Sequence, residues 1–326
     1  MEIIDKLQPF MLPGLIYGIG AIGLAITFRF LKFPDFTVLG SIMVGGIVCI
    51  YISNFSNTTL GLIAGFISGS ILGLFTGFII SGLKIQSVLA SIIVFTASYS
   101  IAYSLTDTGG GTISFNLEKY SIISSVFDLN DILLLLIVSL MICLVIAFII
   151  RTKFGSLLLA MTASKNFLKY RHRYKNIILI LTVGLGNGIV GLAGAFHALR
   201  DKSASVIGHS DFLPIILGAL FGGNAITLWF TNKLHKNRID DDELSKSTKS
   251  PSKLLRFIAS VFSFQREDSK KIGMLFFTYV IGSFFLKEIH GIVHSKAFID
   301  ISFNLSHLII ALLIVFSVWW AGVEEE

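Results

Sequence analysis

Residues 59–81 read TLGLIAGFISGSILGLFTGFIIS, a stretch that has no charged side chain and a glycine at every fourth position. About 20 apolar residues in a helix cross the hydrocarbon core of a bilayer, so this stretch predicts a membrane-spanning helix. Glycines four residues apart lie along one stripe of a helix, where another backbone can approach closely. We therefore interpret them as helix-packing residues, although a subunit interface or a smooth pore wall is an alternative. The packing glycines predicted in this way are Gly61, Gly65, Gly69, Gly73 and Gly77, with a second group at Gly184 and Gly188.

The composition extends this interpretation to the whole chain. Of its 326 residues, 54% are hydrophobic and 14% are charged. A water-soluble domain of this length carries more polar surface, and a membrane β-barrel shows short alternating segments instead of long apolar runs. The sequence therefore predicts an all-α polytopic membrane protein. We predict nine spanning helices, near 9–28, 37–53, 59–81, 85–105, 132–150, 177–199, 212–230, 272–287 and 302–320.

The orientation of these helices follows from a basic loop at 151–176. It holds seven lysines and arginines and no acidic residue: Arg151, Lys153, Lys165, Lys169, Arg171, Arg173 and Lys175. Clustered positive charge stays on the cytoplasmic side of a membrane. Alternating outward from this loop places the N-terminus outside and the C-terminus inside, and it places 106–131 outside. The net charge of +6 then reflects this topology and contact with lipid headgroups.

Three parts are expected along the chain. Residues 1–230 form the main membrane core, which includes the 151–176 loop, and 212–230 either spans the membrane or re-enters it. Residues 231–271 form a flexible cytoplasmic insertion, in which a short amphipathic helix follows Pro251. Residues 272–326 supply C-terminal membrane helices.

Several kinds of site are missing from the sequence. No acidic residue lies within the predicted apolar runs, which argues against an ion-coupled carrier. No phosphate-binding loop motif occurs, so any ATP hydrolysis takes place on another subunit. Glu288, His290 and His294 have a spacing that could serve a metal, but we interpret them as interfacial side chains. No cofactor is expected on this chain, and Cys49 and Cys143 lie within apolar runs and predict no disulfide.

Several stretches together resemble a known family, the permease subunits of bacterial ATP-binding-cassette importers of the branched-chain amino acid and ribose type. The similarity is greatest to the permeases that accompany binding lipoproteins for aromatic amino acids such as tryptophan and tyrosine. The stretches that carry it are TFRFLKFPDFTVLGS at 27–41, LKIQSVLASIIVFTASYSI at 83–101, RTKFG at 151–155 and GNGIVGLAGA at 186–195. The resemblance covers most of 10–230 and is weaker after 231.

The resemblance implies a transport subunit without its own enzymatic site, in the bacterial inner (cytoplasmic) membrane. Its implied partners are a separate ABC ATPase that binds ATP, a substrate-binding protein, a second copy of the permease and membrane lipid, with no nucleic acid. A short helix at about 155–165 would couple to the ATPase through Gly155, Leu158, Leu159, Ala160, Met161, Thr162 and Lys165. The translocation path would involve Pro34, Asp35, Thr37, Ser41, Ser91, Ser98, Tyr99 and Asn187. The hydroxyls of 91–100 could contact a zwitterionic solute, such as an amino acid.

One departure from the family pattern keeps a second hypothesis open. The family's coupling loop contains a Gly-Asp-Asn core, whereas this chain reads LLAMTASKN at 158–166. A non-pumping membrane scaffold or channel derived from such a permease is therefore the alternative function. The resemblance does not identify the substrate, because specificity in such importers rests largely with the binding protein.

Overall fold

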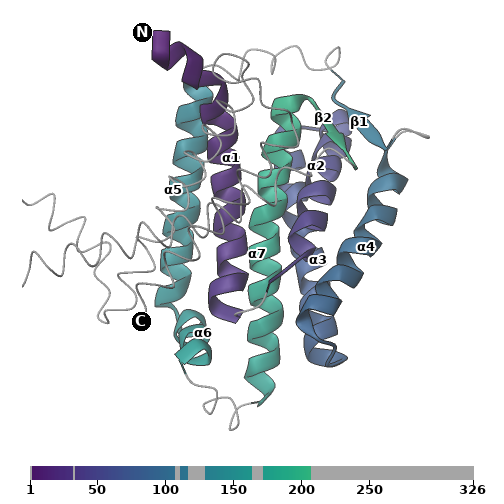
Figure 1. Ribbon diagram of the computed structural model, residues 1–326, viewed down its shortest axis with the longest axis vertical. Helices are drawn as coiled ribbons and strands as arrows, with labels where there is room; N and C mark the ends of the chain where they lie inside the picture. The colour runs from purple at the N-terminus through teal and green to yellow at the C-terminus, as the bar shows by residue number, and fades with distance from the viewer. Residues whose placement is uncertain (1, 32–33, 107–110, 117–128, 164–171, 207–326) are drawn as a thin grey trace, which may run out of the picture.

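The computed structural model describes residues 2–31, 34–106, 111–116, 129–163 and 172–206. These residues form a bundle of helices with one small antiparallel sheet (Figure 1). In chain order the elements are α1 (Glu2–Leu31), α2 (Thr37–Phe55), α3 (Thr58–Gly82), α4 (Ser87–Leu105), β1 (Thr112–Ser114), α5 (Leu129–Arg151), α6 (Lys153–Ala163), α7 (His172–Asp201) and β2 (Ser203–Ser205).

The predicted apolar runs in this part of the chain are helices. Four of them are long and apolar enough to cross a membrane by length and composition: Thr37–Phe55, Thr58–Gly82, Ser87–Leu105 and Asn176–Asp201. The short helix predicted at about 155–165 is α6, which begins two residues earlier, at Lys153. The runs near 212–230, 272–287 and 302–320 and the amphipathic helix after Pro251 lie outside the described residues. The predictions of nine helices and of a cytoplasmic C-terminus therefore remain predictions.

Helix α7 is the centre of the bundle. It contacts α1, α2 and α3, whereas α4 and α5 stand at opposite edges (Figure 1). The glycines of α3 lie very close to the main chain of α7. A Cβ atom added at Gly77 would lie 2.7 Å from the Ile180 Cα, and one added at Gly69 would collide with the Asn187 carbonyl oxygen. Because main chain cannot move aside as a side chain can, only glycine fits at these points.

A second set of small residues lets α2 reach the same helix. A Cβ at Gly45 would collide with the Gly191 carbonyl oxygen, and one at Gly46 would lie 3.0 Å from that of Gly194. Gly184 and Gly188, on α7 itself, pack against Leu74 and Ser70 of α3. The glycine stripe of α3 thus packs against other helices of the same chain.

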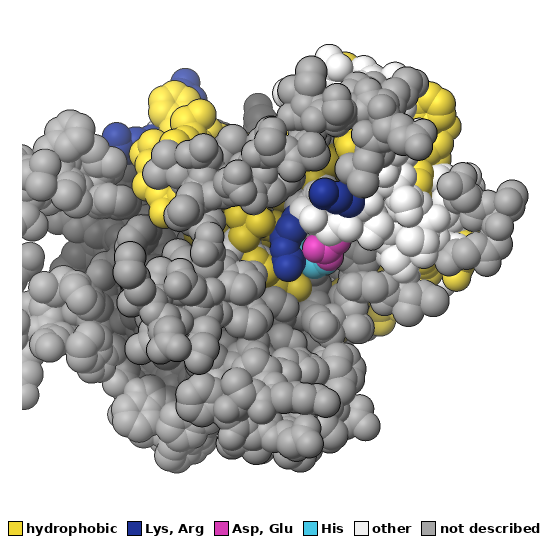
Figure 2. Space-filling view, turned by 90° about the horizontal axis from the view of Figure 1, so that it is seen from above, with side chains coloured by type: hydrophobic (Ala, Val, Ile, Leu, Met, Phe, Trp, Pro, Cys, Tyr) yellow, Lys and Arg dark blue, Asp and Glu magenta, His cyan; other side chains and the backbone are white. Residues whose placement is uncertain are grey.

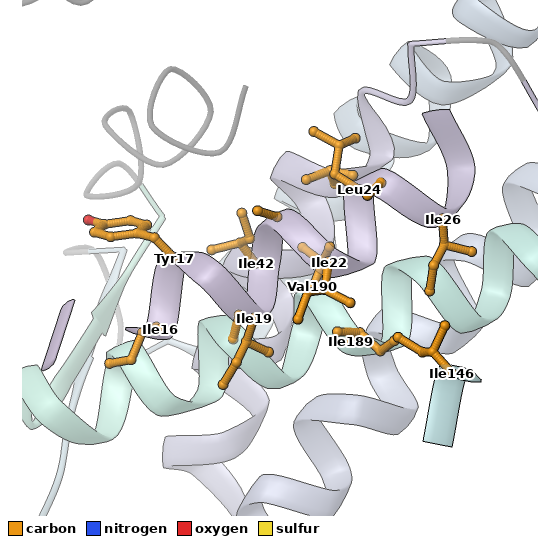
Figure 3. Packing of buried hydrophobic residues seen from close by; sticks show 14 of the residues in the cluster. Ile16, Tyr17, Ile19, Ile22, Leu24, Ile26, Ile42, Ile146, Ile189 and Val190 are labelled. Atoms are coloured by element: carbon orange, nitrogen blue, oxygen red, sulfur yellow. The ribbon is translucent and has the colours of Figure 1, made fainter. Parts of the chain in front are cut away.

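Apolar side chains fill the other side of α7. Ile19 and Ile22 of α1 pack together with Ile189 and Val190 of α7, and Ile146 of α5 lies in the same cluster (Figure 3). Burial of such side chains in a membrane protein gains dispersion contacts more than hydrophobic free energy, because lipid is equally apolar. Close fit therefore decides which helices pair.

One end of the bundle, here called the sheet end, carries a two-stranded sheet that the sequence did not predict. Strands β1 and β2 pair antiparallel, with Ile113 opposite Ala204. The Asn54 side chain extends the pairing from the end of α2: its Nδ2 donates to the Ser114 carbonyl oxygen at 3.0 Å, and its Oδ1 accepts from the Asn116 backbone N–H at 2.9 Å. Each strand has three residues, too few for a period-2 pattern to stand out.

The glycine stripe generates the first prediction. Gly69→Leu forces a side chain into the main chain of α7 and should destabilise the bundle by about 1–3 kcal/mol. The measurement is the midpoint of thermal unfolding of the detergent-solubilised protein. Ile67→Leu is the matched control, because Ile67 on the same helix is 49% exposed. An unchanged midpoint for Gly69→Leu would show that α3 and α7 do not pack as described. From the spacing of the glycines alone, Leu72 would be expected to lie outside the contact between α3 and α7. It is buried, so a substitution there is not a suitable control.

Candidate functional site

The end of the bundle opposite the sheet carries α6, and we call it the α6 end. Helix α6 follows α5 after a bend at Thr152, whose hydroxyl accepts a hydrogen bond from the Gly155 backbone N–H at 3.4 Å. One face of α6 is held by the bundle: Leu158 is 3% exposed and lies in the same apolar cluster as Phe30 of α1 and Ile178 of α7. Lys153 and Ser156 are exposed on the other side.

This packing corrects part of the predicted coupling surface. Leu158 was expected to enter a groove of an ATPase, but its side chain is enclosed by this chain, and Gly155 is buried as well. Leu158 instead fastens α6 to α1 and α7. Leu159, Ala160, Met161 and Thr162 are helical, but their side chains lie outside the described part of the chain, as does Lys165.

A buried polar network joins the centre of α7 to the start of α2. Asn187 donates through Nδ2 to Asp35 Oδ2 at 2.7 Å, and its Oδ1 accepts from the Ser41 hydroxyl at 2.7 Å. The other Asp35 oxygen, Oδ1, accepts from the Thr37 backbone N–H at 2.9 Å. Asp35 thus accepts at both oxygens, from a helix start and from a facing helix. Hydrogen bonds of this kind are strongest when the accepting oxygen belongs to a charged carboxylate.

Thr76 of α3 completes this network and was not among the predicted residues. Its hydroxyl lies 2.8 Å from that of Thr37 and donates to the Leu72 carbonyl oxygen at 3.1 Å. Either hydroxyl can be the donor between the two threonines, because each can donate or accept. The sequence held a signal for Thr76, because its spacings of three and seven residues place it on the helix face of Gly73 and Gly69.

Asp35 lies deeper than the sequence indicated. The sequence places it in a short basic loop next to an apolar run, yet it is 2% exposed and bonds to the middle of α7. Gly40, near the start of α2, lies directly against Ser98 of α4. Helix α4 continues from Ser98 back to Ser87, about 16 Å further at 1.5 Å per residue. The Asp35 side chain, in the turn before α2, is therefore enclosed within the bundle.

Among the described side chains, no positively charged one forms an ion pair with Asp35. The dipoles that oppose the charge of Asp35 come from the Asn187 amide and from the backbone N–H and hydroxyl of Thr37. A helix start carries roughly half a positive charge, so it partly offsets a carboxylate there. Asp35 thus links the loop before α2 to the first residue of that helix and to α7.

The residues predicted to line a translocation path divide into two groups. Side chains of Asp35, Thr37, Ser41, Ser91, Ser98 and Asn187 are buried, and so they border no open path in this conformation. Ser91 and Ser98 donate to carbonyl oxygens of their own helix, those of Val88 and Phe95. Only Pro34 and Tyr99 of the predicted set are exposed.

The sheet end has a different character. Around the end of α7 lie charged side chains, visible among apolar and uncharged polar groups in Figure 2. The Asp201 carboxylate lies 3.4 Å from His197 Nδ1 and 3.5 Å from an Arg200 guanidinium nitrogen. Within the described ranges no group of His, Cys, Asp and Glu could hold a metal ion. Glu288, His290 and His294 lie outside those ranges.

The part of the sequence that forms the described helices matches one protein family. Residues 9–233 match the family described as "Branched-chain amino acid transport system / permease component", which is more than half of the chain. The chain belongs to this family. It is thus a multi-pass protein of the bacterial inner (cytoplasmic) membrane, of a family of transport permease components.

A relative with a described role is the "Tyrosine transport system permease protein" of Clostridioides difficile (strain R20291). It is 26% identical over 189 residues, which are 58% of this chain and 62% of the relative. The match therefore spans less than two thirds of the relative's length. No solved structure matches the chain at a significant level.

The second prediction concerns the carboxylate. Asp35→Asn leaves only one oxygen for two N–H donors, and an unsatisfied buried donor should cost about 1–3 kcal/mol of stability. The double variant Asp35→Asn with Asn187→Asp restores complementarity, because the new carboxylate accepts from both Ser41 and the new amide. Unfolding midpoints of the two single variants and the double variant form a double-mutant cycle.

The expected outcome is a double variant more stable than the sum of the single effects. Ser100→Ala, at an exposed site on α4, is the control and should be silent. Additive effects of the two exchanges would disprove the direct bond between Asp35 and Asn187.

Proposed function

We propose that this chain is the membrane permease subunit of an ATP-binding-cassette importer for an amino acid or related small solute. Two copies would form the translocation path, with two ATPase subunits below and a substrate-binding protein above. The family match over residues 9–233 carries this proposal, because it includes α2 to α7 in full and most of α1. The relative's printed role suggests tyrosine as the first solute to test.

Helix α6 is the proposed point of contact with the ATPase. It is a short helix at one end of the bundle, joined covalently to α5 and packed on α1 and α7. Lys153 and Ser156 lie on its exposed side. A displacement of α6 by a partner bound there would move α1 and α7 through buried Leu158. Leu159, Ala160, Met161, Thr162 and Lys165 remain proposed coupling residues around this anchor. ATP binds on the partner and no catalytic group is proposed here.

The mechanism is alternating access. ATP-driven closure of the ATPases moves the two α6 helices, and the bundle tilts between states open to either side. Glycine contacts suit such a motion, because smooth surfaces of main chain can slide without exchanging interlocked side chains. The buried Asp35 network would hold α2 to α7 so that the two helices move as one unit.

The central test is co-purification. Affinity capture of the full-length chain from its native membrane should retain an ATPase subunit, and cells that express the whole importer should take up labelled tyrosine. Capture of the intact chain without any ATPase would favour the alternative, a scaffold or channel. The observation behind that alternative is the missing Gly-Asp-Asn core at 158–166.

A third prediction separates the two roles of α6. Leu158→Ala should destabilise the permease by about 2–5 kcal/mol, because it empties a buried site. Leu159→Asp together with Met161→Asp should abolish ATPase capture and leave membrane insertion intact, because apolar anchors dominate such interfaces. Ser156→Ala, on the exposed side, is the control for stability. If the double Asp variant still captures the ATPase and imports solute, the coupling assignment is wrong.

A fourth prediction tests the orientation. We expect the positive charge of 151–176, the segment that contains α6, to keep the α6 end in the cytoplasm and so the sheet end outside. In a variant with Cys49 and Cys143 replaced by Ala, a single cysteine at exposed Ser114 should react with a membrane-impermeant thiol reagent in intact cells. A cysteine at exposed Ser156 should react only after the cells are opened. The reverse pattern would invert the proposed topology.

A further inference from the structure

Helix α4 has one face in the bundle and one face open. Its buried residues are Ala90, Ser91, Val94, Ser98 and Ala102, which share one side of the helix. They pack toward α2 and α3, and α4 stands at the edge of the bundle (Figure 1). The opposite face is exposed along the whole helix.

The chemistry of this open face changes halfway along. Toward the α6 end its exposed side chains are aliphatic: Leu89, Ile92 and Ile93. Toward the sheet end they are mostly hydroxyl-bearing: Thr96, Tyr99, Ser100, Tyr103 and Ser104. The spacings of three and four residues place these five on one stripe. We call this stripe the α4 hydroxyl face.

Other edge helices lack such a stripe. Between Leu136 and Phe148 the exposed residues of α5 are all apolar. The exposed residues of α3 from Leu60 to Phe78 are apolar as well. Both helices therefore suit contact with lipid tails along their length. The α4 hydroxyl face is the exception among the described helices.

Hydrocarbon is a poor environment for this face. Thr96 and Ser104 donate to carbonyl oxygens of their own helix, which satisfies their protons. The phenol groups of Tyr99 and Tyr103 are too long to bond to their own helix in this way, and a phenol hydroxyl usually finds water or a polar partner. A row of hydroxyls beside an aliphatic half therefore indicates water along one half of the helix and its exclusion along the other.

We propose that the α4 hydroxyl face lines the water-filled, sheet-end half of the translocation path and contacts a solute without net charge, such as a zwitterionic amino acid. This inference rests on the proposed transport function. The face carries no charged side chain, so it neither attracts nor repels ions strongly. Hydroxyls donate as well as accept, so they can contact the ammonium and the carboxylate of one zwitterion. The aliphatic half, Leu89, Ile92 and Ile93, limits the water at the other end.

A lipid-facing role makes a different prediction. Tyrosines near the end of a spanning helix often lie at the lipid headgroups. Tyr99 and Tyr103 would then anchor α4 in the interface, and Thr96, one turn deeper, would face lipid tails. Reactivity at position 96 distinguishes water from lipid.

The first experiment measures water access. Single cysteines replace Thr96, Ser100, Ile67 of α3 or Leu140 of α5 in the full-length chain with Cys49 and Cys143 exchanged for Ala. A charged, membrane-impermeant thiol reagent is applied to membrane fragments open on both sides. Cysteines at 96 and 100 should react about tenfold faster than those at 67 and 140, because a thiol reacts as the thiolate, which requires water. Equal rates at all positions would overturn the proposal.

The second experiment measures transport. Ser100→Leu makes this position resemble the apolar faces of α3 and α5. It should lower the uptake of labelled tyrosine by about tenfold if the face contacts solute, since a lost hydroxyl contact and added bulk both act there. Ile101→Leu, on the flank of the face, should leave uptake unchanged. Normal uptake by Ser100→Leu, in a chain that inserts normally, counts against solute contact.

The two measurements separate this inference from the proposed function. Fast labelling at 96 and 100 in a chain that captures no ATPase would support a water-filled path along α4 and contradict the proposed importer function. Slow labelling in a chain that captures its ATPase and imports solute would support the importer function and show that the α4 hydroxyl face does not line its path.

Discussion

Contact between main chains at α7 is the constraint on which the rest of the structure depends. Glycines of α3 and α2 reach α7 so closely that a single methyl group would strike backbone at several points. In a bilayer, lipid competes equally for apolar side chains, so such close contacts select which helices pair. Because α3 and α2 approach from two sides, α7 is placed at the centre and the other helices take positions around it.

The buried polar network follows from that closeness. Asn187 can bond to Asp35 and Ser41 only because glycines on either side bring α2 within reach of the middle of α7. The network adds directional specificity that glycines lack, since a smooth surface of main chain has little to define its register. Close packing brings α2 and α7 together, and the hydrogen bonds of Asp35 fix how the two helices are aligned along each other.

The two ends of the bundle have separate chemistry. At the α6 end, Leu158 fixes a short helix on the bundle and leaves Lys153 and Ser156 exposed. At the sheet end, Asn54 ties the strands to α2, and one half of α4 presents hydroxyls. Closely packed helices join these two ends, which is the arrangement that the proposed ATP-driven permease requires.

The sequence by itself determined the membrane class, the positions of the described helices, the glycine stripe and the family resemblance, because apolar runs and fixed spacings are local properties. Only the tertiary structure decided where polar side chains go. Asp35 lies beside a loop in sequence and beside Asn187 in space, while Leu158 turns inward and Tyr99 outward. Helical periodicity shows that residues share a face, but which face meets α7, water or lipid depends on the partners that packing brings. The strands at 112–114 and 203–205 likewise become strands only when α4 and α7 bring them together.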